Sequence, residues 1–66
     1  MYLYIDESIY QTLLQAGFGD YLGQDEDGYY VDYISLIDAG YAEEIDGAVY
    51  LISMRPSQKG IFIGNL

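Results

Sequence analysis

The chain has 66 residues, with eleven acidic and two basic side chains and a formal net charge of −9. Its length fits one domain, so residues 1–66 are expected to form a single domain. Cysteine and histidine are absent, which excludes disulfides, thiolate chemistry and histidine as a general base or metal ligand. The hydrophobic content of 52% and the nine tyrosines are typical of a folded protein, because disordered acidic chains are poor in aromatic residues.

The sequence shows no membrane or export signal. Its longest uninterrupted apolar run, Ala48 to Ile52, is far too short to span a bilayer. The first ten residues, MYLYIDESIY, lack the basic start and apolar core of a signal peptide. An anionic chain is also an unfavourable partner for a membrane surface. The sequence therefore predicts a soluble, cytoplasmic protein that does not bind membranes.

The first elements in chain order are a strand and a helix. Residues 2–5 are apolar and rich in β-forming side chains, which predicts a short strand. A helix is predicted over residues 7–16 because its apolar residues recur on one face. Asp6 is a favourable N-cap, and Gly17 is a favourable residue just beyond the last turn.

The middle of the chain predicts a second strand and a second helix. Residues 18–22 are interpreted as a short strand, and residues 23–28, GQDEDG, as a polar turn. Apolar residues from Tyr30 onwards have helical spacing, which predicts a helix over residues 31–39 that Gly40 ends in the same way as the first.

The last third of the chain predicts a β-hairpin. Residues 41–45 and 48–54 are expected to pair around Asp46-Gly47, because Asp-Gly between apolar runs is a strong hairpin signal. Arg-Pro-Ser at positions 55–57 is expected to end the second strand. Residues 61–63 fit either a strand or a short helical turn.

Two segments of the chain resemble each other. Residues 10–22 read YQTLLQAGFGDYL, and residues 33–45 read YISLIDAGYAEEI. Tyrosine, leucine, alanine and glycine coincide when Tyr10 is aligned with Tyr33, and the separation of the two copies is typical of one supersecondary unit. We interpret them as two helix–glycine–strand units packed into one domain, in an arrangement compatible with a local pseudo-two-fold axis. Chance similarity between two amphipathic helices that end in Ala-Gly is the alternative.

The charge is unevenly distributed along the chain. All acidic residues lie between Asp6 and Asp46, and both basic residues, Arg55 and Lys59, follow them. Direct binding to DNA or RNA is therefore not expected, because phosphate contacts need lysine or arginine. A basic partner is the natural complement of this surface, and opposite charge accelerates the encounter.

The second half of the chain resembles a bacterial winged-helix domain over residues 30–66. The resemblance rests on a helix, Gly40, a hairpin, and Ser57-x-x-Gly60 followed by Ile61 and Phe62. It implies an α+β domain with two helices packed on an antiparallel hairpin or sheet. It does not imply DNA binding, because acidic or neutral side chains occupy the matching positions: Asp32, Ser35 and Asp38 on the helix, and Glu43, Glu44 and Asp46 on the hairpin.

In size, charge and tyrosine content the chain is similar to small phage-encoded inhibitors of host defence. These include anti-CRISPR proteins and DNA-mimic inhibitors of restriction enzymes and glycosylases. The resemblance implies that carboxylates replace phosphates in the cationic channel of a host nucleic-acid-binding protein, in the cytoplasm of the host cell. Alternate residues on a strand lie about 6.6 Å apart on one face, which is of the order of the phosphate spacing. Glu44 and Asp46 are therefore expected to form one row of charges across the hairpin, and Asp20 or residues 25–27 another. The predicted partner-binding residues are Asp20, Asp25, Glu26, Asp27, Tyr41, Glu43, Glu44 and Asp46.

Other roles for the acidic residues fit less well. An EF-hand loop containing residues 25–28 would begin at Gly23 and end at Ile34, neither of which has an oxygen ligand in its side chain. Glu43 and Glu44 are adjacent on a predicted strand and so point to opposite faces, which excludes a paired glycosidase site. The sequence thus predicts no enzyme activity, catalytic residue, metal or cofactor.

A second function remains open. Nine tyrosines are too many to bury in so small a domain with every hydroxyl satisfied, and exposed tyrosines are enriched in interfaces. The simpler explanations are that the tyrosines only cover a thin core and that the acidic residues only keep the protein soluble. The alternative function is a winged-helix-like adaptor that docks on a neutral partner or forms a homodimer without nucleic-acid mimicry.

Overall fold

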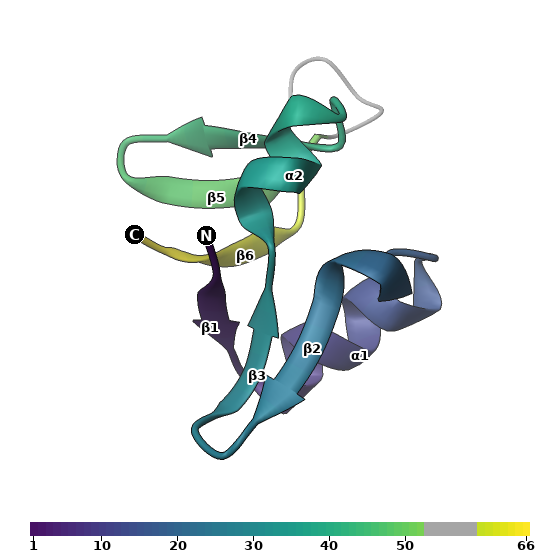
Figure 1. The fold of residues 1–66 in the computed structure, drawn as a ribbon. Coiled ribbons are helices and arrows are strands. Elements are labelled where there is room, and N and C mark those ends of the chain that lie inside the picture. Colours follow the sequence, from purple (N-terminus) through teal and green to yellow (C-terminus); the bar gives the residue numbers. More distant parts are fainter. Residues whose placement is uncertain (53–59) are drawn as a thin grey trace.

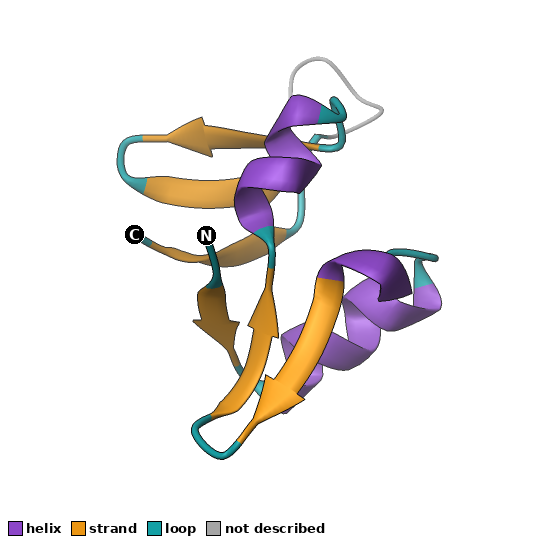
Figure 2. Cartoon of the chain, viewed as in Figure 1, coloured by secondary structure: helices purple, strands orange, loops and turns teal. Residues whose placement is uncertain are grey.

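The computed structural model describes residues 1–52 and 60–66, and within them the chain forms an α+β domain (Figures 1 and 2). The described residues contain two α-helices and two antiparallel three-stranded sheets, with strand orders β1-β3-β2 and β4-β5-β6. The predicted α+β class is confirmed. The elements are β1 (Leu3–Ile5), α1 (Glu7–Gln15), the 3₁₀ helix η1 (Gly19–Tyr21), β2 (Leu22–Asp25), β3 (Gly28–Val31), α2 (Tyr33–Asp38), β4 (Ala42–Ile45), β5 (Ala48–Leu51) and β6 (Phe62–Asn65).

The first helix forms where the sequence predicts it. The Asp6 carboxylate accepts a hydrogen bond of 2.8 Å from the backbone N–H of Ile9, which satisfies a free donor at the start of α1. Gly17 has a φ of +94°, a conformation that glycine adopts without strain. Its N–H bonds to Leu14 and the N–H of Phe18 bonds to Leu13, the pattern of a Schellman C-cap.

The segment after α1 differs from the prediction. Residues 19–21 form the 3₁₀ helix η1, so the predicted strand over residues 18–22 is wrong. The predicted polar turn over residues 23–28 is also wrong in extent, because most of it is strand and only Glu26 and Asp27 connect β2 to β3. The Asp25 carboxylate accepts a 2.8 Å hydrogen bond from the N–H of Asp27, and this side-chain contact stabilises so short a turn.

The second helix is shorter than predicted. It begins at Tyr33, because Asp32 is its N-cap and accepts hydrogen bonds from both the backbone N–H and the hydroxyl of Ser35. Tyr30, whose spacing suggested helix, lies in β3. Gly40, with a φ of +85°, follows the helix as predicted.

The predicted hairpin is confirmed as β4 and β5. Its connecting residues, Asp46 and Gly47, have φ values of +51° and +79°, as a type I′ turn requires. Residues 53–54 and the predicted break at 55–57 lie outside the described residues. The C-terminal segment, left open between strand and helical turn, is a strand: β6 pairs with β5, with a bulge at Val49/Tyr50.

The two helices end in the same way, as the internal repeat predicts. The Schellman bonds of α2 join Gly40 to Ile37 and Tyr41 to Leu36. They repeat those of α1 in the predicted alignment, in which Gly17 matches Gly40.

The hairpins repeat as well, but in a different alignment, in which Leu22 matches Ala42. β2 pairs with β3 from Leu22↔Val31 to Asp25↔Gly28, and β4 pairs with β5 from Ala42↔Leu51 to Ile45↔Ala48. We call this second alignment the hairpin alignment. The backbone bond from Asp32 N–H to Tyr21 C=O has its counterpart there in Ile52 N–H to Tyr41 C=O.

The two alignments differ because the first unit is longer between its glycine and its hairpin. The additional residues lie between Gly17 and β2, where η1 forms. Each unit is therefore a helix followed by a hairpin, and a third strand, β1 or β6, completes each sheet.

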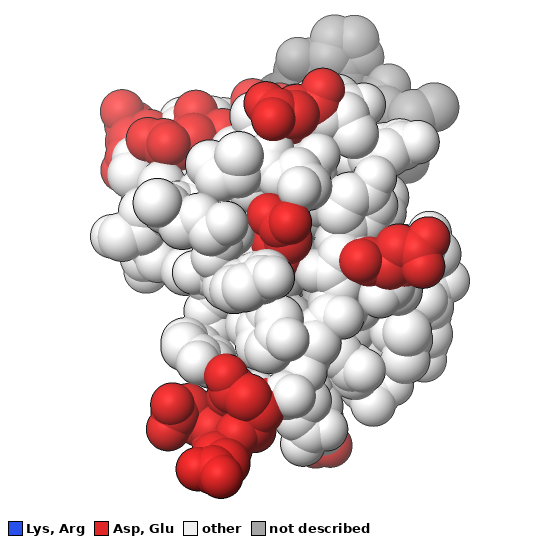
Figure 3. Space-filling view, in the orientation of Figure 1, with Lys and Arg blue, Asp and Glu red and all other residues white. Residues whose placement is uncertain are grey.

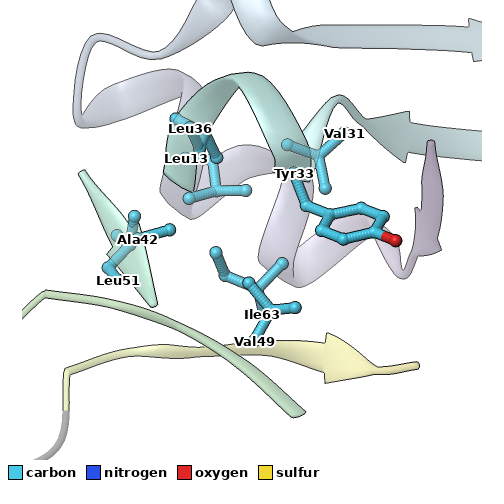
Figure 4. Close-up of a cluster of buried hydrophobic side chains, with 8 residues drawn as sticks. All are labelled: Leu13, Val31, Tyr33, Leu36, Ala42, Val49, Leu51 and Ile63. Carbon is cyan, nitrogen blue, oxygen red and sulfur yellow. The ribbon is translucent and has the colours of Figure 1, made fainter. Parts of the chain in front are cut away.

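One hydrophobic core joins the two units (Figure 4). Leu13 of α1 and its counterpart Leu36 of α2 are both fully buried in it. β1 and β6 lie against each other (Figure 1), and a Cβ on Gly64 would lie 2.9 Å from the Leu3 side chain. The core residues are Leu13, Val31, Tyr33, Leu36, Ala42, Val49, Leu51 and Ile63.

The winged-helix resemblance is not confirmed. The helix in this resemblance, α2, has only six residues. The resemblance reflects the local succession of helix, glycine and hairpin, and this succession occurs twice in the described chain.

Candidate functional site

The acidic side chains are on the surface. All eleven lie within the described residues, and every one is exposed except Asp32, which is half-buried. Figure 3 shows acidic patches over the turn between β2 and β3 and over the hairpin of β4 and β5, together with other acidic groups on the same face. Both basic side chains, Arg55 and Lys59, lie outside the described residues. Within the described part, the one ion pair joins the N-terminal amine to Asp32 at 3.9 Å.

The first acidic patch is the tip of the β2–β3 hairpin, where Asp25, Glu26 and Asp27 are consecutive. We call it tip 1. Asp25 has a structural role in the turn, because its two carboxylate oxygens accept hydrogen bonds from the N–H of Asp27 and the hydroxyl of Tyr4. Glu26 and Asp27 are the exposed connecting residues. The structure thus brings these three predicted site residues together.

The second acidic patch, tip 2, consists of Glu43, Glu44 and Asp46 on the β4–β5 hairpin. Glu43 is opposite Tyr50 in the strand register, and Glu44 is opposite the buried Val49. The two glutamates therefore face opposite sides of the sheet, while Asp46 lies in the turn. Tip 2 thus presents charge on both sides of a hairpin. The predicted row of Glu44 and Asp46 rests on strand alternation, but β4 ends at Ile45 and Asp46 lies in the turn.

The two tips correspond to each other in the duplicated unit. In the hairpin alignment, Glu26 of the first turn matches Asp46 of the second. The same supersecondary unit therefore carries a carboxylate at the same turn position twice.

The remaining two predicted site residues lie apart from both tips. Asp20 is in η1, and Tyr41 precedes β4 at the end opposite Asp46. The Tyr41 ring packs on Phe18 and Tyr21, with centroid distances of 5.2 and 6.4 Å. The tyrosine beside the acids of tip 2 is therefore Tyr50, and Tyr41 belongs to an aromatic cluster where the two units meet.

A second tyrosine cluster, which the sequence did not predict, covers the outer face of the first sheet. Tyr4 and Tyr30 are register partners on β1 and β3, and Tyr2 lies next to Tyr30 with ring centroids 4.6 Å apart. The Tyr4 hydroxyl donates a 2.7 Å hydrogen bond to Asp25, which links this cluster to tip 1. The alternation of Tyr2-Leu3-Tyr4-Ile5 was the available signal, because alternate residues on a strand share a face.

This hydrogen bond shifts the pKa of both of its partners. Hydrogen bonding to Asp25 raises the pKa of Tyr4 to about 12. The bonds from the Tyr4 hydroxyl and from the backbone at Asp27 lower the pKa of Asp25 below its usual range. The bond is thus lost only when pH falls through the lowered pKa of Asp25 or rises through that of Tyr4, and Asp25 stays ionised throughout the physiological range.

We expect Tyr4→Phe to raise the pKa of Asp25, because the strongest hydrogen bond that stabilises the carboxylate is then removed. Carboxyl ¹³C NMR titration of the parent and the variant measures this change. The pKa of Asp32, which a bond to the Ser35 hydroxyl lowers, is the internal control and should not move. An unchanged pKa of Asp25 in Tyr4→Phe would show that the bond does not hold in solution.

Two further features of the described residues bear on the site. No group of three or more carboxylates within the described ranges is placed to hold a metal ion. None of the helices in the described part is long and apolar enough to cross a membrane.

Comparison with known proteins gives no relative on which a function could be based. No protein-family model matches the chain, and no curated protein or solved structure matches it either. The site is therefore interpreted from its own geometry.

Proposed function

We propose that this protein is a non-enzymatic inhibitor that blocks a basic nucleic-acid-binding protein by presenting an anionic, nucleic-acid-like surface. The proposal rests on one observation above all: the duplicated unit places an acidic hairpin tip on the surface twice. A target that has evolved to hold phosphates offers lysine and arginine side chains to such a surface. Complexes of host defence, including CRISPR effectors, fit this chemistry, and the host cytoplasm is where they act.

Two properties of the surface support this function. The carboxylates of both tips are exposed, and they make no ion pair within the described residues. The tips are held in place by a side-chain hydrogen bond in one turn and by a type I′ geometry in the other.

The adaptor function rests on a different part of the surface. Phe62 and Tyr41 are 42% and 48% exposed, so an apolar interface or a homodimer could form without the acidic tips. Charge separates the two functions, because ionic strength screens an interface of opposite charges but has little effect on an apolar one.

The test is the salt dependence of binding to a partner captured from the native host with the tagged protein. For the inhibitor, we expect affinity to fall about tenfold or more between about 50 and about 300 mM sodium chloride, because exposed charge pairs are screened within about 10 Å at 0.1 M salt. Isothermal titration calorimetry at several salt concentrations measures it. An affinity that stays constant over this range would contradict the inhibitor and favour the adaptor.

A further inference from the structure

The outer face of the sheet β1-β3-β2 carries a group of aromatic rings that the core does not use. We call Tyr2, Tyr4, Tyr30 and Asp25 the tyrosine platform. Tyr4 meets Tyr30 edge to face, with centroids 6.2 Å apart and planes at 83°, and Tyr2 is tilted against Tyr30 at 49°. Tyr2 and Tyr4 are 61% and 52% exposed, and none of the three tyrosines belongs to the hydrophobic core.

The platform depends on a glycine in the neighbouring strand. Gly23 is the register partner of Tyr30, and a Cβ at position 23 would lie within van der Waals overlap of Cζ of the Tyr30 ring. The ring therefore lies over the backbone of Gly23, in space that any other residue would fill. This arrangement holds the Tyr30 ring close to the backbone of the sheet, with the rings of Tyr2 and Tyr4 beside it.

The platform combines aromatic rings with negative charge. Asp25 is fixed at its edge by the 2.7 Å bond from Tyr4, and Asp27 lies near enough to add to the rise in the pKa of the Tyr4 phenol. A phenol that donates to a carboxylate has a more electron-rich ring, which strengthens its attraction for a cation. Cations near the faces of tyrosine rings gain further stabilisation when water is excluded.

We infer that the tyrosine platform binds an arginine side chain of the basic partner. The inference rests on the proposed function, which supplies a partner of opposite charge. A guanidinium is planar, stacks on aromatic rings and is weakly hydrated, whereas the lysine ammonium is a compact and strongly hydrated charge. The platform offers both ring surface and a fixed carboxylate, a combination that suits arginine better than lysine.

The second sheet provides an internal comparison. Tyr50 is the counterpart of Tyr30 in the hairpin alignment, and it meets Phe62 with centroids 5.6 Å apart. Its register partner is Glu43, where the first sheet has Gly23. The second sheet has a glutamate at the position where the first sheet has the glycine under the Tyr30 ring, so it does not repeat the packing of the platform.

The direct test uses the tripeptide acetyl-Gly-Arg-Gly-amide as the probe, at low salt, with the tyrosine ring signals followed by ¹H–¹³C NMR. We expect saturable shifts at Tyr2, Tyr4 and Tyr30, no binding of the tripeptide with citrulline in place of arginine, and about threefold weaker binding with lysine. Tyr4→Ala should weaken binding of the arginine tripeptide about fivefold or more, because it removes a ring face and the link to Asp25.

Two further variants refine the test. Gly23→Ala should also weaken binding, because its Cβ displaces the Tyr30 ring while the exposed charges stay the same. Leu14→Ala is the control, since Leu14 is 43% exposed and lies outside the platform and both tips, and it should change the affinity less than about twofold. Amide spectra of each variant confirm that the fold is retained.

The outcomes distinguish the failure of the tyrosine platform from the failure of the proposed inhibitor function. Shifts spread equally over both tips and unaffected by Tyr4→Ala, or equal binding of the lysine and arginine tripeptides, would overturn the platform and leave the anionic inhibitor in place. Tripeptide binding at the platform combined with salt-independent binding of the captured partner would support the platform and overturn the inhibitor. Loss of partner affinity in Tyr4→Ala but not in Leu14→Ala would support both.

Discussion

Leu13→Ala is expected to reduce the free energy of unfolding by about 2–5 kcal/mol, the usual cost of removing a fully buried leucine side chain from a core. Leu13 is 0% exposed and belongs to a cluster that combines both helices and both sheets. A domain of this length has a total stability of only roughly 3–10 kcal/mol. The variant should therefore be partly or largely unfolded at room temperature, as urea denaturation followed by circular dichroism would show.

The duplicated unit supplies a second variant and a close control. Leu36 is the counterpart of Leu13 and is equally buried, so Leu36→Ala should have a similar effect. Leu14 is the next residue on α1 but is 43% exposed, and Leu14→Ala should cost less than about 1 kcal/mol because little apolar area is lost from the interior. If Leu13→Ala were no more destabilising than Leu14→Ala, the two units would not share the core described here.

The second large effect concerns the acidic tips. A quintuple variant should bind the partner about 100-fold or more weakly. It combines Glu26→Gln and Asp27→Asn at tip 1 with Glu43→Gln, Glu44→Gln and Asp46→Asn at tip 2. One screened pair is worth only about 0–1 kcal/mol, so single changes should have small effects and the loss should grow with the number of charges removed. Asp25 is left unchanged because its carboxylate holds the turn.

The control for these changes must remove charge without disturbing structure. Asp6 and Asp32 are unsuitable because they are helix N-caps. Glu7→Gln with Asp38→Asn removes two exposed charges away from the tips and should weaken binding about threefold or less, in keeping with the small value of isolated surface charges. Equal losses per charge at the control and tip positions would mean that total charge matters and that the placement of the tips does not.

The elements that the sequence predicted well are those with local signals at both ends. Asp6 and Gly17 bracket α1 with a cap and a C-terminal glycine, and Asp46-Gly47 defines the second hairpin through its positive φ angles. These signals act within a few residues, so the structures that they favour do not depend on contacts with the rest of the chain.

The first hairpin was missed because the strand signals in its own residues are weak. β2 contains Gly23 and Asp25, which are poor strand formers, and its turn depends on a carboxylate that bonds to the backbone of a nearby residue. The segment is a strand because β3 pairs with it while also pairing with β1. Tyr30 had helical spacing with the residues after it, but the Asp32 cap starts the helix later and leaves Tyr30 in the sheet.

The site was predicted in part for the same reasons. Exposed acids are visible in the sequence, and both hairpin tips were among the predicted residues. Their grouping into two equivalent tips required the register of both hairpins. The tyrosine platform required the pairing of β1 with β3, which joins residues far apart in the chain, and the register that places Gly23 opposite Tyr30.

The most direct test of nucleic-acid mimicry is competition on the captured partner. Surface-immobilised partner is saturated with the labelled protein, and duplex DNA, or the partner's own guide or target nucleic acid, is then titrated in. Mimicry predicts that nucleic acid displaces the parent protein completely. It also predicts that the quintuple tip variant is displaced at a much lower concentration of nucleic acid. A ternary complex in which nucleic acid and the parent protein occupy the partner together, with the tip variant bound as tightly as the parent, would contradict mimicry.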